Sequence, residues 1–255
     1  MFPPWLKKLQ ARFLLVLLLA GISNNLHAKE VNIGMGNFEP YFIEKGETGI
    51  FTDIINLVFA QLGDYQPKYL WGLSNNQLWL NFEAGKLDAV SNLFDSVKLN
   101  ACRTDPIFRF RDVAISNARD HYKINNINDL WGKNIVTFEG AKDFFGEEFS
   151  SIIRKGFYRE VAKPHTQVRE LHKRRADVSV GDMFIFLHSI KNKQEVNSRP
   201  QDFSFHDIFP AISSRMGFQD KKVCTLFNEA LKKIRKNGQY EKVYHSYLRK
   251  LNYVF

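Results

Sequence analysis

Cysteine is scarce in this chain of 255 residues, which contains only Cys102 and Cys224. The two lie far apart in the sequence, and there is no CxxC motif. Thioredoxin-like chemistry and zinc ribbons need closely spaced cysteines, so both are excluded. Two such cysteines either form a disulfide or stay free and buried. The Cα separation that decides between these alternatives is not contained in the sequence.

Common catalytic motifs are also missing, since the chain has no GxSxG, HExxH or GxxxxGK[ST]. The segment 34–36, Gly-Met-Gly, lacks the third glycine of a dinucleotide-binding fingerprint and precedes a turn. The seven histidines are scattered, and no pair has ligand spacing together with a third partner. We therefore expect no metal, no cofactor and no catalytic residue, which favours a binding protein over an enzyme.

Long apolar runs are absent except for Phe13–Ile22, ten residues that follow a basic N-terminal segment. Polar residues come next, and the small residue Ala28 suits cleavage. This order is typical of a secretory signal peptide over residues 1–28, and ten apolar residues are too few to span a bilayer. A membrane anchor is the alternative. We expect an exported periplasmic protein that is cleaved near Ala28.

The charge of the chain is basic, with 36 lysines and arginines against 27 acidic residues and a net charge of +9. Loss of Lys7, Lys8 and Arg12 with the signal peptide leaves 33 basic residues against 27, a net charge of +6. The remaining lysines are dispersed, mostly at helical spacing, so they are typical of solvated helix faces. We therefore expect no nucleic-acid partner.

Two segments of the chain resemble each other, Leu87–Asn92 and Asp177–Asp182. Each follows a predicted helix, and each is a short β-branched run that ends on a polar side chain. Open α/β sheets bind ligands at the carboxyl ends of their strands. The pair predicts two βα lobes that face one cleft suited to a small polar molecule.

Periodicity and turn residues predict the individual elements. Short connections between alternating strands and helices favour mainly parallel sheets. The extended segments Phe108–Ser116 and Ile208–Met216 are candidates for crossings between the lobes. Strands are predicted near 31–35, 65–71, 87–91, 134–138, 158–162 and 177–180, and helices over 52–62, 74–84, 140–155 and 221–236, with a further helix capped by Thr166.

This order of elements resembles the periplasmic amino-acid-binding proteins, the solute receptors of ABC importers, over residues 31–248. The marks of the resemblance are short motifs in a fixed order: Asn37–Phe42, Gly49–Asp53, Gly85–Ala89, Asp105–Phe108, Asn128–Lys133, Asp177–Asp182 and Asn237–Tyr240.

The resemblance implies an α/β fold of type II, with two lobes, two mainly parallel sheets flanked by helices, and two interlobe crossings. Lobe 1 is expected over 29–112 and 213–255, and lobe 2 over 113–212. The C-terminal segment then returns to lobe 1, which brings Cys102 and Cys224 into one lobe and favours a disulfide.

An amino-acid receptor must replace the hydration of an ammonium and a carboxylate, because unpaired buried charges are costly. Asp182 ends a strand at the expected cleft, and the resemblance places the family's amine-binding aspartate there. An N-cap for the next helix is the alternative role, compatible with the first. Asp177, at the start of the same strand, is expected to be structural.

The segment expected to bind the ligand carboxylate departs from the family, whose pattern has an arginine soon after a Thr or Ser. Here the segment 92–106 is shorter, with Lys98 nearest the expected place and Arg103 as its only arginine. Lysine cannot make the planar, two-pronged contact of arginine. Three hypotheses stay open: Lys98 substitutes, Arg103 reaches in, or the ligand has no α-carboxylate.

Five further residues are candidates for ligand contacts. Gly140 and Ala141 open a predicted helix whose N–H groups suit an anion, although the family's hydroxyl is missing; a plain strand-to-helix junction is the alternative. The resemblance places aromatic rings over the ligand in the loop that holds Phe38 and Tyr41. Asn92 ends its strand as a polar contact.

We expect a monomeric periplasmic receptor that captures a small polar ligand, an amino acid or a derivative, and delivers it to an ABC permease in the inner membrane. One alternative is a sensory or orphan binding module whose partner is a sensory receptor. The other is a small dehydratase-type enzyme on the same fold.

Overall fold

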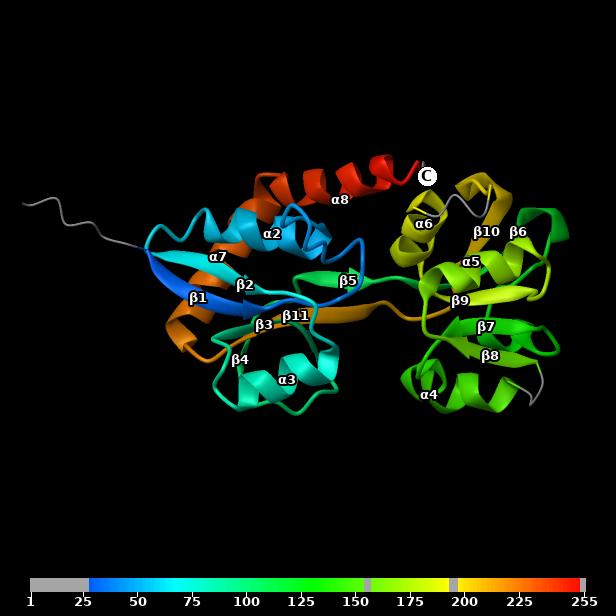
Figure 1. Ribbon diagram of the computed structural model, residues 1–255, viewed down its shortest axis with the longest axis horizontal. Helices are drawn as coiled ribbons and strands as arrows, with labels where there is room; N and C mark the ends of the chain where they lie inside the picture. The colour runs from blue at the N-terminus through cyan, green and yellow to red at the C-terminus, as the bar shows by residue number, and fades with distance from the viewer. Residues whose placement is uncertain (1–27, 154–156, 193–196, 253–255) are drawn as a thin grey trace, which may run out of the picture.

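The computed structural model describes residues 28–153, 157–192 and 197–252. The predicted signal peptide therefore lies outside the described residues, apart from Ala28. Two β-sheets with helices on both faces form two lobes that lie side by side (Figure 1).

The sheet of the first lobe combines strands from both ends of the chain. β1 runs parallel to β2 and β3, whereas β11 runs antiparallel to β3, β4 and β5. The strand order is β2 (Tyr65–Leu70), β1 (Lys29–Gly34), β3 (Ala89–Phe94), β11 (Ile212–Phe218) and β4 (Cys102–Arg103), with β5 (Phe108–Phe110) also paired to β11.

The sheet of the second lobe has five strands from the middle of the chain. β7 pairs in parallel with β8 and β9, whereas β6 is antiparallel to β9 and β10. The order is β10 (Phe203–His206), β6 (Asp112–Asn117), β9 (Val178–Asp182), β7 (Ile135–Phe138) and β8 (Tyr158–Val161).

The prediction of mainly parallel sheets is wrong, because both sheets are mixed. The segment Phe108–Ser116, predicted as an extended crossing between the lobes, passes at Arg111 from β5 of one sheet to β6 of the other. β6 is antiparallel to its neighbour β9, and β11 is antiparallel to its neighbour β3, so each sheet contains antiparallel pairs. The parallel pairs expected within each βα run are present.

Helices cover both faces of the first sheet (Figure 1). α2, α7 and α8 pack together on one face, and α3 packs beside β3 on the other. The apolar stripe predicted for α2 is buried at Ile54, Ile55 and Val58. The bounds are α2 (Ile50–Phe59), α3 (Asn75–Glu83), α7 (Lys221–Lys236) and α8 (Gln239–Lys250).

The second lobe has α5 and α6 on one face of its sheet and α4 on the other (Figure 1). Thr166 is not the helix cap that we predicted, because α5 begins two residues earlier at Pro164, whose missing N–H is tolerated in the first turn. α4 ends at Ile152 rather than at 155. The helices are α4 (Ala141–Ile152), α5 (Pro164–His172) and α6 (Met183–Asn192), with short 3₁₀ turns at Ala118–Asp120, Ile127–Leu130 and Pro200–Asp202.

The largest apolar core continues from one lobe into the other. Aromatic rings form the bridge: Tyr41 and Phe108 of the first lobe each lie 6.1 Å from Phe184 of α6, measured between ring centroids. α8 reaches the same place, where Tyr244 contacts Phe184 at 5.3 Å. These contacts connect α6 of the second lobe to the first lobe.

Candidate ligand-binding site

A cavity of about 870 Å³ lies between the two sheets. Its wall is contributed by the carboxyl ends of β3, β7 and β9, by the start of β6, and by the first turns of α3, α4 and α6. Cavities of 300–1,000 Å³ are typical of small-molecule sites. The cavity lies where a cleft was predicted from the two similar segments Leu87–Asn92 and Asp177–Asp182.

Aromatic rings make up much of the wall. Phe38 lies 6.1 Å from Phe110, and Phe138 lies 5.5 Å from Phe144, measured between ring centroids. Trp79 is held by its indole N–H, which donates to the Asn92 carbonyl oxygen over 3.1 Å. Flat aromatic faces of this kind bind apolar groups and, through their negative faces, cations.

Two buried carboxylates lie side by side at the floor of the cavity. Asp112 and Asp182 are direct partners in the antiparallel pairing of β6 with β9, and their residues are 4% and 8% exposed. Burial raises the pKa of both carboxyls, and the charge of Asp182 raises the pKa of Asp112 further. The pair therefore favours a state in which one of the two carboxyls is protonated, because two neighbouring negative charges repel each other strongly where they are shielded from water.

The two carboxylates differ in their partners. Asp182 accepts hydrogen bonds from the Ile185 N–H at 3.0 Å and from the Tyr41 hydroxyl at 2.8 Å. It thus caps the first turn of α6 and also joins the lobes. The side-chain carboxylate of Asp112, by contrast, has no hydrogen-bond donor among the described residues, although it lines the cavity. Its oxygens are available to a ligand.

Asn92 connects the cavity wall to the first sheet. Its side-chain oxygen accepts from the Ser214 hydroxyl at 2.6 Å, and its side-chain nitrogen donates to the Asn75 oxygen at 2.9 Å. Ser74 caps α3 in a capping box with Gln77, so the first turn of that helix is fixed beside Asn92. The amide therefore positions the α3 side of the wall.

Four residues predicted for the site line the cavity: Phe38, Asn92, Gly140 and Asp182. The other four do not. Tyr41 and Ala141 are completely buried, and Tyr41 directs its hydroxyl to Asp182 rather than into open space. Tyr41 thus supports the site from behind.

Neither cation predicted for the ligand carboxylate is on the wall. Lys98 is exposed and lies outside the cavity lining. Arg103 donates from its guanidinium to the backbone carbonyls of Phe94 and Val97, which fixes the loop after β3. Both of these guanidinium nitrogens of Arg103 are therefore already hydrogen-bonded to the backbone.

Five residues on the wall were not predicted from the sequence: Asp112, Trp79, Asn75, Glu139 and Asp143. Asp112 opens the crossing strand β6, and only the antiparallel register with β9 brings it beside Asp182. Glu139 directly precedes Gly140 in the sequence, so its position at the predicted strand-to-helix junction indicated that it could lie at the site.

The N-terminus of α4 is already bound to a carboxylate of the chain. The Gly140 N–H donates to Glu160 Oε2 at 2.9 Å, and the Lys142 N–H donates to Glu160 Oε1 at 3.3 Å. A hydrogen bond from the Tyr158 hydroxyl at 2.5 Å, together with these two backbone bonds, lowers the pKa of Glu160. The predicted anion site is therefore occupied by Glu160 from β8.

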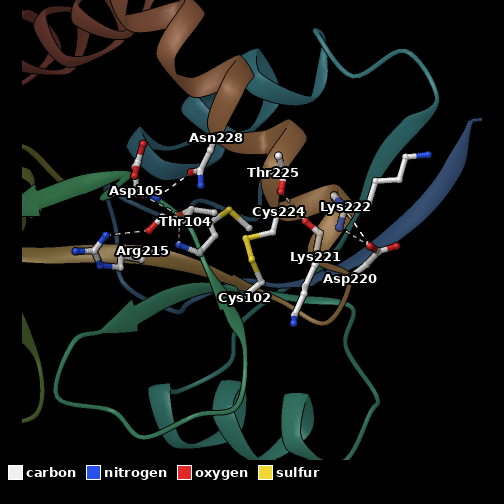
Figure 2. The surroundings of a disulfide bond; sticks show 12 residues. Cys102, Thr104, Asp105, Arg215, Asp220, Lys221, Lys222, Cys224, Thr225 and Asn228 are labelled. Carbon is white, nitrogen blue, oxygen red and sulfur yellow. Dashed lines mark hydrogen bonds between the residues drawn. A yellow bond between two sulfur atoms is a disulfide. The ribbon is translucent and has the colours of Figure 1, made fainter.

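The two cysteines form a disulfide between β4 and α7, with 6.1 Å between their Cα atoms (Figure 2). This result excludes free thiols. Asp220 caps α7 just before the bridge, accepting from the Lys222 N–H at 2.7 Å. On the other side, the Asp105 N–H donates to the Asn228 side chain at 2.8 Å, so the bridge lies in a region with further hydrogen bonds.

Two negative findings apply to the described residues 28–153, 157–192 and 197–252. They contain no group of three or more histidine, cysteine, aspartate or glutamate residues arranged to hold a metal ion. They also contain no helix that is long and apolar enough to cross a membrane.

Comparison with solved structures identifies the architecture. An ancestral cationic amino acid solute-binding protein superposes with a TM-score of 0.70 at 17% identity, covering 87% of this chain and 96% of that one. The chain has the two-lobed fold of the periplasmic binding proteins. The GluR0 ligand-binding core in complex with L-glutamate has this fold too, with a TM-score of 0.69, 12% identity and coverage of 87% and 99%.

A third structure with the periplasmic-binding-protein fold is a histidine kinase sensor domain, with a TM-score of 0.66, 16% identity and coverage of 86% and 96%. In sequence, no family model matches the chain, and no curated protein matches it. At these identities the comparisons establish the fold and not the ligand.

Proposed function

We propose that this protein is an exported solute-binding protein that captures a small polar ligand, an amino acid or a derivative, and delivers it to an ABC importer of the inner membrane. The observation that carries the proposal is the cavity of about 870 Å³ between the two sheets, with the buried Asp112–Asp182 pair at its floor. Structures of this fold described as bound to arginine, glutamine and L-glutamate support it.

The proposed mechanism is closure of two lobes around the ligand. Lobe 1 comprises 29–112 and 213–255, and lobe 2 comprises 113–212, which places one wall of the cavity on each. A ligand shifts the balance between open and closed forms only by its different affinity for the two. In this role the protein is exported by signal peptide 1–28 and acts as a monomer in the periplasm.

Among the residues predicted from sequence, Asp182, Phe38, Asn92 and Gly140 are proposed to line the bound ligand. Asp182 holds an ammonium group, and the ring of Phe38 covers the ligand. The proposal does not depend on Lys98, which is exposed.

The test is a thermal-shift panel on residues 29–255, after partial unfolding to remove carried-over ligand. The panel contains amino acids, amines, organic acids and neutral sugars. A ligand at a hundredfold its Kd adds about 2.7 kcal/mol to the free energy of unfolding, which raises the midpoint of a protein of this size by about 5–10 °C.

We expect at least one member of the panel to produce such a shift, and an Asp182→Asn variant to lose it. Asp64→Asn serves as a matched control, since Asp64 is exposed and outside the cavity. If no compound shifts the midpoint, or if the shift persists in Asp182→Asn, solute capture in this cleft is wrong.

A sensory role is the second candidate, favoured by the match to a histidine kinase sensor domain. The two roles differ in what the bound form does. Deleting the gene should abolish uptake of the radiolabelled ligand if the protein serves an importer. Unchanged uptake with a lost transcriptional response to the same ligand would instead establish sensing.

A further inference from the structure

The wall of the cavity has no positive charge to meet a ligand carboxylate. Among the described residues that line it there is no lysine, arginine or histidine. Two arginines of the first lobe are engaged elsewhere: Arg103 binds the Phe94 and Val97 carbonyls, and Arg215 pairs with Asp95 over 2.7 Å. A carboxylate brought into this wall would lose its hydration without gaining a cation, which is unfavourable.

The N-terminus of α4 is the second place at the cavity that could bind an anion, and it is also occupied. Two of its backbone N–H groups already donate to Glu160. An incoming carboxylate would have to displace that carboxylate and would then lie beside the acidic side chains of Glu139 and Asp143. Both features therefore disfavour an anion in the cleft.

The charge that the wall does carry is negative. All four of its ionisable side chains are acidic: Asp112, Glu139, Asp143 and Asp182. Asp112 adds an independent observation, because the residue is only 4% exposed and lines the cavity, and its carboxyl has no hydrogen-bond donor among the described residues. A buried carboxylate without a donor is the complement of an ammonium or guanidinium group.

The aromatic part of the wall fits the same ligand. Phe38, Trp79 and Phe110 come from the first lobe, and Phe138 and Phe144 from the second. Ring faces attract organic cations and cover the alkyl or aryl part of an amine. The cavity therefore combines a negative floor with apolar, π-rich sides, and its volume of about 870 Å³ accommodates a molecule with an extended chain.

We propose that the cleft binds an organic cation, a primary amine or guanidinium compound that has no carboxylate group. This inference rests on the proposed function and specifies the ligand class of that same site. The cationic group lies between Asp112 and Asp182, and the rest of the molecule extends between the aromatic rings toward Glu139 and Asp143. A second cationic group at that end is accommodated by these two acids.

Matched ligand pairs test this ligand class. Isothermal titration of residues 29–255 with agmatine and arginine, cadaverine and lysine, and phenethylamine and phenylalanine compares molecules that differ by one carboxylate. We expect the carboxylate-free member of at least one pair to bind with about tenfold or greater advantage. Asp112→Asn and Glu139→Gln should each weaken its binding, whereas Asp64→Asn should not. Glu139 is exposed, so that variant stays informative if Asp112→Asn fails to fold.

Two results would overturn the ligand class while the proposed function survives. One is tighter binding of the amino acid in every pair that binds. The other is silence of all pairs together with binding of a neutral or anionic compound from the thermal-shift panel. Silence across the pairs and the whole panel would overturn the proposed function as well.

Discussion

Replacing Asp112 by asparagine is expected to change how the stability of the protein depends on pH. Asp112 faces Asp182 across β6 and β9, and the Tyr41 hydroxyl approaches Asp182 from the first lobe. Burial and this neighbouring charge raise the pKa of the Asp112 carboxyl above its value in an unfolded chain. The folded state therefore binds more protons than the unfolded state over the interval between the two values.

The sign follows from linkage: where the folded state holds the extra proton, the free energy of unfolding falls as pH rises. The contribution is complete below the unfolded pKa of about 3.9 and is lost as pH rises through the folded pKa. One such proton changes stability by about 1.4 kcal/mol per pH unit, or by up to about 2.7 kcal/mol between pH 5 and pH 7. Asparagine does not titrate, so the variant lacks this loss.

Thermal unfolding followed by circular dichroism measures the effect at pH 5, 6, 7 and 8 and constant ionic strength. The midpoint of Asp112→Asn relative to wild type should rise by up to about 5–10 °C from pH 5 to pH 7. Burial lowers the pKa of His206, but this residue is the same in both proteins and cancels in the difference. Asp64→Asn should show the wild-type profile. Parallel profiles for Asp112→Asn and wild type would refute the shared-proton account.

Three further perturbations address the framework around the site. Reduction, or the double variant Cys102→Ala with Cys224→Ala, opens a loop of 122 residues. The larger chain entropy of the unfolded state should then lower the free energy of unfolding by about 2–5 kcal/mol. Urea unfolding should give a lower midpoint than that of the oxidised protein, and equal midpoints would contradict this prediction. Tyr41→Phe removes the buried 2.8 Å hydrogen bond to Asp182. We expect the free energy of unfolding to fall by about 1.5–3 kcal/mol in the same assay, and a change below about 0.5 kcal/mol would contradict this role of Tyr41. Ser74→Ala removes the cap of α3 and should cost about 1 kcal/mol, whereas an exposed Ser151→Ala variant outside α3 should cost little.

Local sequence patterns predicted the elements of the fold because their signals are short-range. The apolar stripe of Val223, Phe227 and Leu231 places α7 from Lys221 to Lys236, where the structure has it. The strands that carry Asn92 and Asp182 follow from β-branched runs bounded by polar residues. Both residues lie on the cavity wall, so this local signal also located part of the site.

The remaining part of the site depends on contacts between distant segments. Asp112 becomes a neighbour of Asp182 only through the antiparallel register of β6 and β9, which strand propensity does not encode. The engagement of Arg103 with carbonyls of the loop after β3, and that of Glu160 with α4, likewise arise from tertiary packing. For this reason the sequence left three hypotheses for the ligand carboxylate, and the structure favours a ligand without one.

A crystal structure of the protein grown with saturating agmatine tests the central claim most directly. We expect agmatine in the cleft, with nitrogen atoms about 2.7–2.9 Å from the carboxylate oxygens of Asp112 and Asp182. Its chain should lie between Phe38 of the first lobe and Phe138 of the second, which both line the cavity. A cleft empty of agmatine, and equally empty in crystals grown with cadaverine and with phenethylamine, would contradict the account. Arginine bound there under the same conditions, with its carboxylate at α4 in place of Glu160, would contradict the ligand class.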